Sequence, residues 1–324
     1  MSGGLVTLGE TMALLRSSEV GSLSHAASMA LGLGGAESNV AIGVRRLGLP
    51  ATWIGVLGQD SLGDRVQREL QAEGLGLSVR RNAQAPTGLM LKESLTQEHR
   101  AVWYYRAGSA GSTLGPEDVK DEALDGAAVL HVTGITPALS DTARAAVDAA
   151  VDRARARGIH VSLDVNFRGR LWSAEEARPV LRSLAKRVDT IFGGAEELAM
   201  LVDAEPSPAA DELAQAEELL RLLAADGRTV VAKLGALGAL AREGARGTAV
   251  RMPAVRIQPV DTVGAGDAFV AGYLAELIVG EPLEARLRLA VQTGAFACLH
   301  PGDWEGLPRR GDLALLGAGE AVAR

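Results

Sequence analysis

The sequence is poor in cysteine, in aromatic residues and in net positive charge. A single cysteine, Cys298, among 324 residues excludes a disulfide framework within the chain. We expect this thiol to pack as a small buried hydrophobe in a reducing compartment. Aromatic residues make up 3% of the chain, so the core must pack mainly through small aliphatic side chains. The formal net charge of −7 predicts no basic surface and no nucleic-acid partner.

Long apolar runs are also missing. No stretch of about 18 apolar residues occurs, which argues against a membrane span. The first residues, Met1–Gly4, lack the basic and apolar regions of a signal peptide. We therefore expect a cytoplasmic protein. The hydrophobic content of 47% and charged content of 23% are typical of a soluble globular enzyme.

Strand and helix patterns alternate through most of the chain. Ser140 is a predicted cap of an alanine-rich helix that Gly158 ends, and Ser38 or Asn39 is the predicted cap of an earlier helix. The predicted strands of this part are 5–8, 52–57, 128–133, 159–165, 190–193 and 229–234. Such alternation predicts an α/β fold with a mostly parallel sheet flanked by helices. Ligands bind beyond the carboxyl ends of the strands in such sheets.

Residues 87–108 break this alternation. Two strands, 87–95 and 100–108, flank a polar turn with no helix between them, which predicts a hairpin. With residues 11–16 the hairpin could form a small β-sheet that acts as a lid on a single domain spanning 1–324. Apolar strands are rarely left exposed. We therefore expect a homo-oligomer, a dimer or higher, that forms through this lid.

The most informative segment is 261–274. Two glycines close a turn, Asp267 follows at once, and an apolar helix begins. Backbone N–H groups at such a turn can hold phosphate, so Gly264, Ala265 and Gly266 are the predicted anion hole. A carboxylate would repel phosphate, so Asp267 is better explained as a base that takes a proton from an attacking hydroxyl. The alternative is a glycine turn that only starts a helix.

The segment 261–274 resembles the C-terminal signature of the ribokinase-like (PfkB) sugar kinases, and Gly34-Gly35-Ala36-Glu37-Ser38-Asn39-Val40-Ala41 resembles the N-terminal signature of that family. The two signatures are spaced as in the family, and the resemblance covers essentially the whole chain. It implies a ribokinase-like fold, ATP as co-substrate and Mg²⁺ as cofactor. It also implies that Gly34, Gly35 and Asn39 contact the substrate.

Two further segments are candidates for the nucleotide side. Lys233-Leu234-Gly235-Ala236-Leu237-Gly238 resembles the nucleotide loop of the family, although a plain hairpin turn would have the same pattern. In the segment 164–168, the carboxylate of Asp164 and the amide of Asn166 suit Mg²⁺ or its waters, and Arg168 can bridge phosphate oxygens. The alternative there is a surface ion pair between Asp164 and Arg168. We expect ATP to contact Asn166, Arg168, Lys233, Gly235, Gly238, Gly264 and Gly266.

The metal sites are less clearly marked. Glu197 matches the glutamate of the Asn-x-x-Glu motif that the family links to Mg²⁺, but Gly194 replaces the asparagine. Glu197 could hold Mg²⁺ through water, or could belong to a helix N-terminal turn that favours acids. Asp261 falls in a region that borders a monovalent-cation site, K⁺ for example, in some members. The same residue could simply fix the turn, and the sequence leaves both readings open.

The hairpin carries the best indication of the substrate. Tyr104 and Arg106 share one face of a strand and together could receive a carboxylate, unless Arg106 is merely exposed. The segments 104–110, 130–139, 164–172 and 302–306 resemble the 2-keto-3-deoxygluconate kinases of the family. That resemblance implies substrate contacts from Gly34, Tyr104, Arg106, Arg168, Asp267 and Asp303. Met90 stands where this branch often has tyrosine, so it either faces the sugar or fills the apolar face of the lid.

The predicted reaction is phosphorylation of the C6 hydroxyl of 2-keto-3-deoxygluconate by ATP. Three alternatives remain. The acceptor could be another sugar, such as fructose, ribose or a nucleoside. The enzyme could accept both the gluconate- and the galactonate-derived epimers. The chain could also be a regulator that binds nucleotide or sugar without turnover.

Overall fold

The computed structural model describes residues 3–17, 19–96, 99–202 and 211–316. Within them the chain forms a nine-stranded sheet in the order β13-β12-β11-β10-β9-β8-β1-β4-β5. All neighbouring strands from β11 to β5 pair in parallel, and only β12 and β13 are antiparallel. The mostly parallel sheet is confirmed. Its strands are β1 (Gly4–Leu8), β4 (Ala51–Gly58), β5 (Gly76–Asn82), β8 (Ala127–Thr133), β9 (His160–Asp164), β10 (Thr190–Gly193), β11 (Thr229–Lys233), β12 (Ala239–Glu243) and β13 (Val250–Met252).

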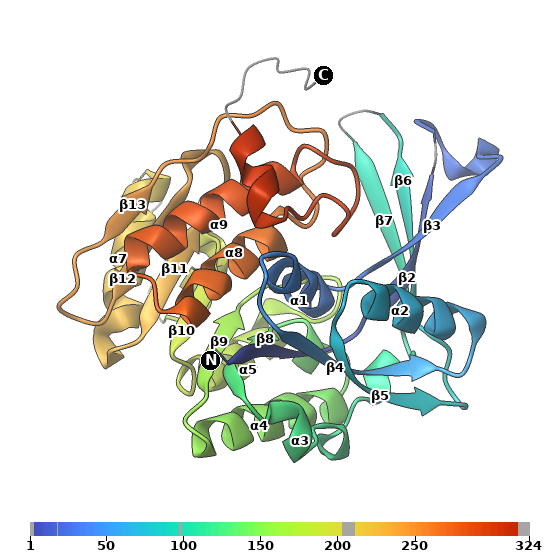
Figure 1. Ribbon diagram of the computed structural model, residues 1–324, viewed down its shortest axis with the longest axis horizontal. Helices are drawn as coiled ribbons and strands as arrows, with labels where there is room; N and C mark the ends of the chain where they lie inside the picture. Colours follow the sequence, from blue (N-terminus) through green and yellow to red (C-terminus); the bar gives the residue numbers. More distant parts are fainter. Residues whose placement is uncertain (1–2, 18, 97–98, 203–210, 317–324) are drawn as a thin grey trace.

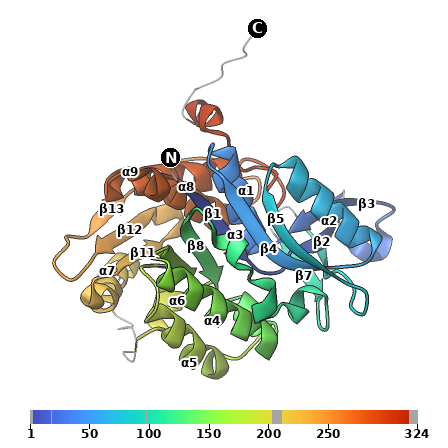
Figure 2. The ribbon, with the colours of Figure 1, turned by 60° about the horizontal axis from the view of Figure 1, so that its bottom comes forward.

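Helices cover both faces of this sheet (Figures 1 and 2). One core cluster joins the sheet to α1 (Ala36–Arg46), α2 (Ser61–Ala72), α8 (Ala265–Val279) and α9 (Leu283–Ala297). The cluster on the opposite face includes α3 (Asp121–Leu124), α4 (Asp141–Ala156), α5 (Ala174–Ala185), α6 (Ala195–Ala199) and α7 (Glu212–Leu223). Strand β1 serves both faces, because Leu5 and Val6 point into different clusters. Burial on two faces explains why its sequence is mostly apolar, without alternating polar positions.

A separate four-stranded sheet projects from this body (Figure 1). Its order is β3 (Met29–Gly34), β2 (Met12–Ser17), β6 (Leu89–Ser94) and β7 (Arg100–Tyr105). The predicted hairpin is confirmed, since β6 and β7 pair antiparallel. Strand β3 was not predicted, because its sequence MALGLG has two glycines and no β-branched residue. A small apolar cluster of Met12, Leu14 and Met90 holds the sheet together.

The helix caps show one prediction that holds and one that fails. Ser140 caps α4, since its hydroxyl accepts the N–H of Ala143. The predicted cap of α1 at Ser38 or Asn39 is wrong, because α1 begins at Ala36 after Gly35. Ser38 lies inside the first turn and donates to the carbonyl of Gly35. Asn39 is thereby freed from capping, so its side chain can serve the site described below.

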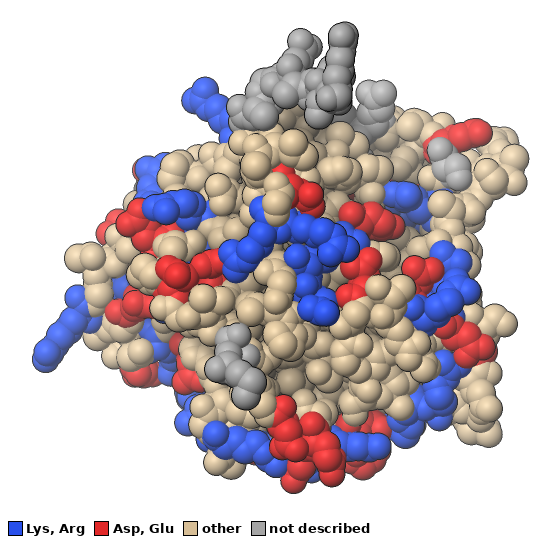
Figure 3. Space-filling model, viewed as in Figure 1, with Lys and Arg blue, Asp and Glu red and all other residues tan. Residues whose placement is uncertain are grey.

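The surface agrees with the composition. On the face seen in Figure 3, acidic and basic side chains are interspersed, and a group of basic side chains near the centre of the view is bordered by acidic ones. Among the helices of the described residues, none combines the length and apolarity needed to cross a bilayer.

Candidate active site

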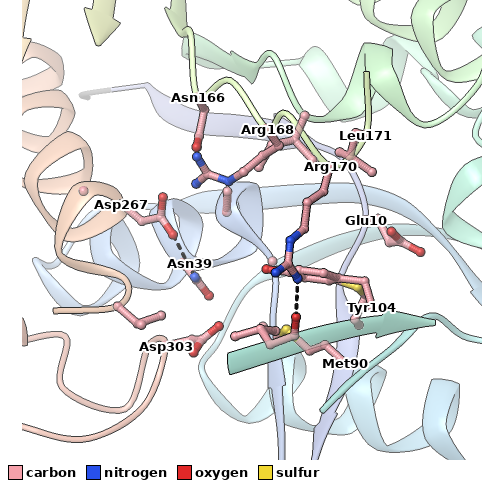
Figure 4. Close-up of a pocket in the computed structure, with 18 of the residues that line it drawn as sticks. Glu10, Asn39, Met90, Tyr104, Asn166, Arg168, Arg170, Leu171, Asp267 and Asp303 are labelled. Atoms are coloured by element: carbon pink, nitrogen blue, oxygen red, sulfur yellow. Dashed lines mark hydrogen bonds between the residues drawn. The ribbon is translucent and has the colours of Figure 1, made fainter. Parts of the chain in front are cut away.

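A cavity of about 1080 Å³ lies between the nine-stranded body and the small sheet. It opens beyond the carboxyl ends of β1, β9 and β11, where an open parallel sheet is expected to bind its ligand. Figure 4 shows side chains from both parts pointing into it. The predicted residues that line it are Gly34, Gly35, Asn39, Met90, Tyr104, Arg106, Asn166, Arg168, Glu197, Lys233, Gly264, Gly266, Asp267 and Asp303. Four predicted residues, Gly235, Gly238, Asp261 and Ala265, are not part of the lining.

Asp267 stands in the first turn of α8 and faces the cavity (Figure 4). Burial raises the pKa of this carboxyl to about 7. The nearby carboxylate of Asp164 raises it too, while the amide of Asn39 and the cations of Lys233 and Arg168 lower it. The Asn39 Nδ2 donates to Asp267 Oδ2 at 2.8 Å. Asp267 is therefore a carboxyl whose pKa lies near neutrality and whose orientation a neighbour fixes, as suits a proton acceptor.

The turn before Asp267 presents backbone rather than side chains. Gly264 is the N-cap of α8 and adopts a left-handed conformation, with φ of 75°. A side chain there would overlap the carbonyl oxygen of Asp303, so glycine is required. The first N–H groups of a helix have no partner within the helix, and Gly264 and Gly266 line the cavity, so their N–H groups are available to an anion there. Ala265 differs from the prediction, since its N–H donates to the Thr262 carbonyl at 3.3 Å.

Lys233 and Asp164 form an ion pair beside Asp267. The Lys233 Nζ lies 2.8 Å and 2.6 Å from the two oxygens of Asp164, which is 2% exposed. The suggested surface pair between Asp164 and Arg168 is wrong, because Asp164 is buried and pairs with a different cation. Burial lowers the pKa of the Lys233 ammonium, but the carboxylates of Asp164 and Glu197 outweigh it and the pKa is raised. Lys233 is thus a charged ammonium at the cavity wall.

Asn166 and Arg168 follow β9 directly. Asn166 has φ of 41°, and among the described residues it is the one non-glycine residue with positive φ. Such backbone strain persists only where the surroundings enforce it, and it is frequent at binding sites. Figure 4 shows the side chains of Asn166 and Arg168 at the same end of the cavity as Asp267. Two donors of phosphate-binding type therefore lie near the proton acceptor.

Glu197 caps helix α6. Its Oε2 accepts the N–H of Gly194 at 2.8 Å, and its Oε1 accepts the N–H of Phe167 at 3.0 Å. Glu197 therefore does belong to a helix N-terminal turn, as one of the two alternatives predicted. Its carboxylate also lines the cavity. In the described part of the chain, no three His, Cys, Asp or Glu residues are grouped to hold a metal ion. A metal here would need oxygen atoms from a ligand or water in addition to Glu197.

The predicted nucleotide loop is a turn between two antiparallel strands. Residues Gly235–Leu237 form a short 3₁₀ turn that joins β11 to β12. Gly238 has φ of 95°, and a side chain there would overlap the carbonyl of Met252. Both expectations for this segment are thus compatible with its geometry. The hairpin is observed, and the role toward ATP stays a prediction.

The opposite end of the cavity is formed by close approach of three segments. A side chain at Gly34 would overlap Met90 and the carboxylate of Asp303, so glycine is needed to bring them together. Met90 is 5% exposed and belongs to the apolar cluster of the small sheet, yet it also lines the cavity. Met90 therefore fills the apolar face of the small sheet, and its contact with a sugar stays a prediction. Burial raises the pKa of Asp303, which the ammonium of Lys92 counteracts.

Arg106 has a partner that the sequence did not reveal. Its Nε and a terminal nitrogen lie 2.7 Å and 2.6 Å from Oε2 of Glu10, whose side chain is 1% exposed. Glu10 also accepts the hydroxyl of Ser109. The exposed-arginine alternative is wrong, because the Arg106 side chain is only 11% exposed. Tyr104 lines the cavity beside it, with the guanidinium 5.9 Å from its ring centre.

Arg170 is a second cation at this end that sequence reasoning missed. It reaches from the body across the cavity toward the small sheet (Figure 4), where it donates to the carbonyl of Val102 at 2.6 Å. Within the described residues it forms no ion pair with a carboxylate. The dense basic pattern Arg168-Gly169-Arg170 after β9 was the available signal.

Asp261 lies behind the anion-hole turn rather than on the cavity wall. It is 3% exposed, and its Oδ2 lies 3.0 Å from the ammonium of Lys92, a residue of β6. Its Oδ1 accepts the N–H of Val263 at 3.1 Å. Asp261 thus does fix the turn, and a cation does stand beside it, supplied by this chain.

The family model for pfkB carbohydrate kinases matches residues 3–310. The chain is 34% identical to a 2-dehydro-3-deoxygalactonokinase of Haloferax volcanii, with 97% of this chain and 99% of that protein covered. It is 36% identical to a 2-dehydro-3-deoxygluconokinase of Bacillus subtilis, with 95% and 94% covered. The crystal structure of a 2-dehydro-3-deoxygluconokinase from Thermotoga maritima is similar to this chain with a TM-score of 0.85 and 27% sequence identity. The match covers 98% of this chain and 99% of that one. The chain therefore belongs to the pfkB family of carbohydrate kinases and has the ribokinase-like fold.

Proposed function

We propose that this member of the pfkB carbohydrate kinases transfers the γ-phosphoryl group of ATP to the C6 hydroxyl of 2-keto-3-deoxygluconate. The product is 2-keto-3-deoxy-6-phosphogluconate. The observation that carries the proposal is Asp267, an oriented carboxyl with a pKa of about 7 beside backbone anion donors. The relatives named as kinases of 2-dehydro-3-deoxy sugar acids, another name for 2-keto-3-deoxy sugar acids, support the choice of acceptor.

Asp267 acts as the base in this proposal. Its carboxylate takes the proton of the C6 hydroxyl while the hydroxyl oxygen forms a bond to the γ-phosphorus. The bond from that phosphorus to the β–γ bridging oxygen breaks, and ADP leaves with the electron pair. Asn39 holds Asp267 Oδ2, so the second oxygen is directed to the cavity. The N–H groups of Gly264 and Gly266 stabilise the charge on the transferred group.

The nucleotide is proposed to lie at the Asp267 end. Arg168 and Lys233 supply positive charge toward its phosphates, and Asn166 supplies an amide. The turn with Gly235 and Gly238 is proposed to meet the rest of the nucleotide. Mg²⁺ bound with ATP would add charge neutralisation, and Glu197 and Asn166 offer the oxygen donors that this ion prefers. Each Glu197 oxygen accepts one N–H and keeps a lone pair for a metal-bound water.

The sugar acid is proposed to lie at the end formed by the small sheet, against Gly34, Gly35, Met90 and Asp303. Its carboxylate would meet the hydroxyl of Tyr104 and the guanidinium groups of Arg106 and Arg170. Glu10 neutralises and orients Arg106, so Arg170 contributes the net positive charge at this end. Such a receptor favours an acid over a neutral sugar.

A second acceptor has specific support. The relative from Haloferax volcanii is named for the galactonate-derived epimer, and its similarity extends over 97% of this chain. We therefore propose that the enzyme also accepts 2-keto-3-deoxygalactonate, which differs at one carbon. Neutral acceptors such as fructose, ribose or a nucleoside offer Arg170 no negative charge. A regulator without turnover would not need a carboxyl whose pKa is tuned to about 7.

Initial-rate kinetics with Mg²⁺ and ATP test this proposal. The panel contains both sugar acids, fructose, ribose and 3-deoxyfructose, which has CH₂OH in place of the carboxylate of 2-keto-3-deoxygluconate. We expect kcat/KM to be at least about tenfold higher for one of the acids than for 3-deoxyfructose, the effect of roughly one charged hydrogen bond. Equal values for the acid and this analogue would contradict the acceptor while leaving kinase activity intact.

The small sheet is also proposed to mediate a dimer. Trp103 and Tyr105 point to the face opposite Tyr104 and are 42% and 62% exposed. Large apolar side chains that are neighbours on one sheet face mark a contact surface. Light scattering at micromolar concentration should give twice the mass of one chain. A monomer would contradict the proposal, and replacement of both residues by serine should shift a dimer toward monomer without loss of fold.

A further inference from the structure

Lys92 is a buried lysine that joins the small sheet to the body. It lies on β6 and is 2% exposed. Its ammonium lies 3.0 Å from Oδ2 of Asp261, which opens the anion-hole turn. It also lies 3.5 Å from Oδ1 of Asp303, in the loop that follows α9. An ammonium is costly to bury without opposite charge, so this position is stable only because the two carboxylates meet there.

The two aspartates hold the parts of the chain that form the anion hole. Asp261 accepts the N–H of Val263 at 3.1 Å and that of Gly302 at 3.4 Å, so one carboxylate ties the turn to the following loop. Gly264 packs against the backbone carbonyl of Asp303, where no side chain would fit. A shift of either carboxylate therefore moves the N–H groups that face the phosphoryl site.

Two buried carboxylates this close repel each other unless a cation stands between them. The charged groups that face Asp303 are Lys92, Asp261 and Glu305, and of these only Lys92 is positive. Glu305 is itself engaged, since its Oε2 accepts the N–H groups of Asp303 and Trp304. Without Lys92, the pair would need a small cation from solution in the same place.

We propose that Lys92 is a positioning residue, a cation built into the small sheet that holds the anion-hole turn and the Asp303 loop in their reactive arrangement. The inference rests on the proposed function, because an anion hole has a role only if a phosphoryl group is transferred. Lys92 touches neither substrate nor the reacting atoms in this scheme and acts through Asp261 and Asp303. Its ammonium takes the place beside Asp261 that a monovalent cation such as K⁺ would otherwise occupy. The small sheet and the phosphoryl site are thereby connected by one charge.

The first test needs no variant. Initial rates are measured in choline, sodium, potassium and ammonium chloride at one ionic strength, with saturating Mg²⁺ and ATP. We expect wild-type kcat to agree within about twofold in all four salts. Activation by K⁺ of more than about fivefold would overturn the inference, because it would mean that Lys92 does not supply the cation.

The second test replaces the ammonium. Lys92→Ala and Lys92→Met should lower kcat about 10–100-fold in choline chloride, while the KM values for both substrates change less than about threefold. Ammonium or K⁺ should raise the kcat of Lys92→Ala at least tenfold above its value in choline chloride, because the missing side chain leaves room for the ion. Lys120→Met, at an exposed site on the body, is the control and should resemble wild type. A Lys92→Ala protein with more than half the wild-type kcat in choline chloride would overturn the inference.

Two further measurements keep the test decisive. The double variant Lys92→Met/Asp261→Asn removes both charges, so it should fold even if the single variants do not. We expect it to remain at least tenfold slower than wild type with no response to K⁺, and wild-type kcat here would overturn the inference.

The melting temperature can be measured without turnover. Saturating K⁺ should raise the melting temperature of Lys92→Ala by about 2–4 °C and leave the melting temperature of wild type unchanged. If wild type phosphorylates nothing in the panel, the proposed function fails, and these melting curves alone decide on Lys92.

Discussion

The two ends of the cavity present charge to a ligand in different ways. At the Asp267 end, the anion donors are backbone N–H groups at the start of α8, and the key side chain lies three residues after Gly264. At the small-sheet end, the charged groups are carried by side chains. There Glu10 pairs with Arg106, and Arg170 crosses over to the carbonyl of Val102.

This difference suggests a division of tasks. Backbone donors fixed by a helix cannot change identity, so the Asp267 end suits a phosphoryl group that every member of the family must handle. Side chains can be replaced one at a time, so the small-sheet end suits selection among sugars. Variants at the first end should therefore alter kcat for every acceptor. Variants at the second should alter the ratio between acceptors.

The largest effect is expected at Asp267. Replacement by asparagine removes the proton acceptor, so kcat should fall about 10²–10⁴-fold for all acceptors. Nucleotide binding should survive because the anion donors are backbone. Calorimetric titration with a non-hydrolysable ATP analogue checks this. A variant that keeps more than about a tenth of wild-type kcat would contradict the role of Asp267 as base.

The same variant has an expected effect on stability. Burial raises the pKa of Asp267 in the folded protein from 3.8 to about 7, so the folded state holds a proton that the unfolded state loses between these values. The free energy of unfolding therefore falls as pH rises from about 4 to 7. Asp267→Asn escapes this loss. It should melt at a higher temperature than wild type at pH 8, and the difference should shrink toward pH 5.

The next effect concerns the turn itself. Gly264→Ala places a methyl group against the carbonyl of Asp303, which displaces the donors, so kcat should fall about 10²–10³-fold. Gly280→Ala is a matched control at the other end of α8. Gly280 also has positive φ, 93°, but open space surrounds its missing side chain. That variant should lose about 1–2 kcal/mol of stability and keep its activity. Equal kcat losses in both would mean that only backbone strain matters.

The sequence predicted the Asp267 end well for a physical reason. Gly264, Gly266 and Asp267 are contiguous, and a glycine turn before an apolar helix dictates their geometry locally. Asn166 and Arg168 could be added because strand ends of a parallel sheet meet at one edge. The small-sheet end depends on distant pairs instead. Glu10 and Arg106 are 96 residues apart, and Lys92 and Asp261 are 169 apart, so no local pattern marks either pair.

The fold shows the same limit. The six strands predicted for the main sheet were located within one residue, and the predicted strand 100–108 ends three residues too late. The glycine-containing β3 was missed, and so were β5, β12 and β13. The predicted cap at Ser38 or Asn39 failed because a good capping residue can equally serve inside the first turn. Asn39 instead contacts Asp267 across 228 positions of sequence. The partner of a side chain that is brought close by tertiary packing can be identified only from the structure.

A moderate effect is expected at the small-sheet end. Arg106→Ala and Arg170→Ala each remove a charge-assisted hydrogen bond, worth roughly 1.5–3 kcal/mol, so kcat/KM for the sugar acid should fall about 10–150-fold. The KM for ATP should hardly change, and 3-deoxyfructose should be less affected. Arg106→Ala should also melt lower, because Glu10 is left buried without its partner. If neither variant alters the ratio of acid to 3-deoxyfructose, the carboxylate does not bind at this end.

The smallest effect expected is the pH dependence that the Asp267 end imposes on every acceptor. The base must be ionised to take a proton, so kcat/KM should rise with pH and level off above the pKa of about 7. The ionised fraction grows about tenfold between pH 6 and pH 8 for such a group, and the rate should follow it. The cations proposed to bind the sugar acid at the small-sheet end are arginines, which do not titrate in this range. Arg170→Ala should therefore keep the midpoint of the wild-type pH profile at a lower rate. Asn39→Ala removes the hydrogen bond that lowers the pKa of Asp267, so the midpoint of its pH profile should move upward. A wild-type profile that is flat from pH 6 to 8 would show that Asp267 is already ionised or takes no part, and the contrast between the two ends would lose its electrostatic basis.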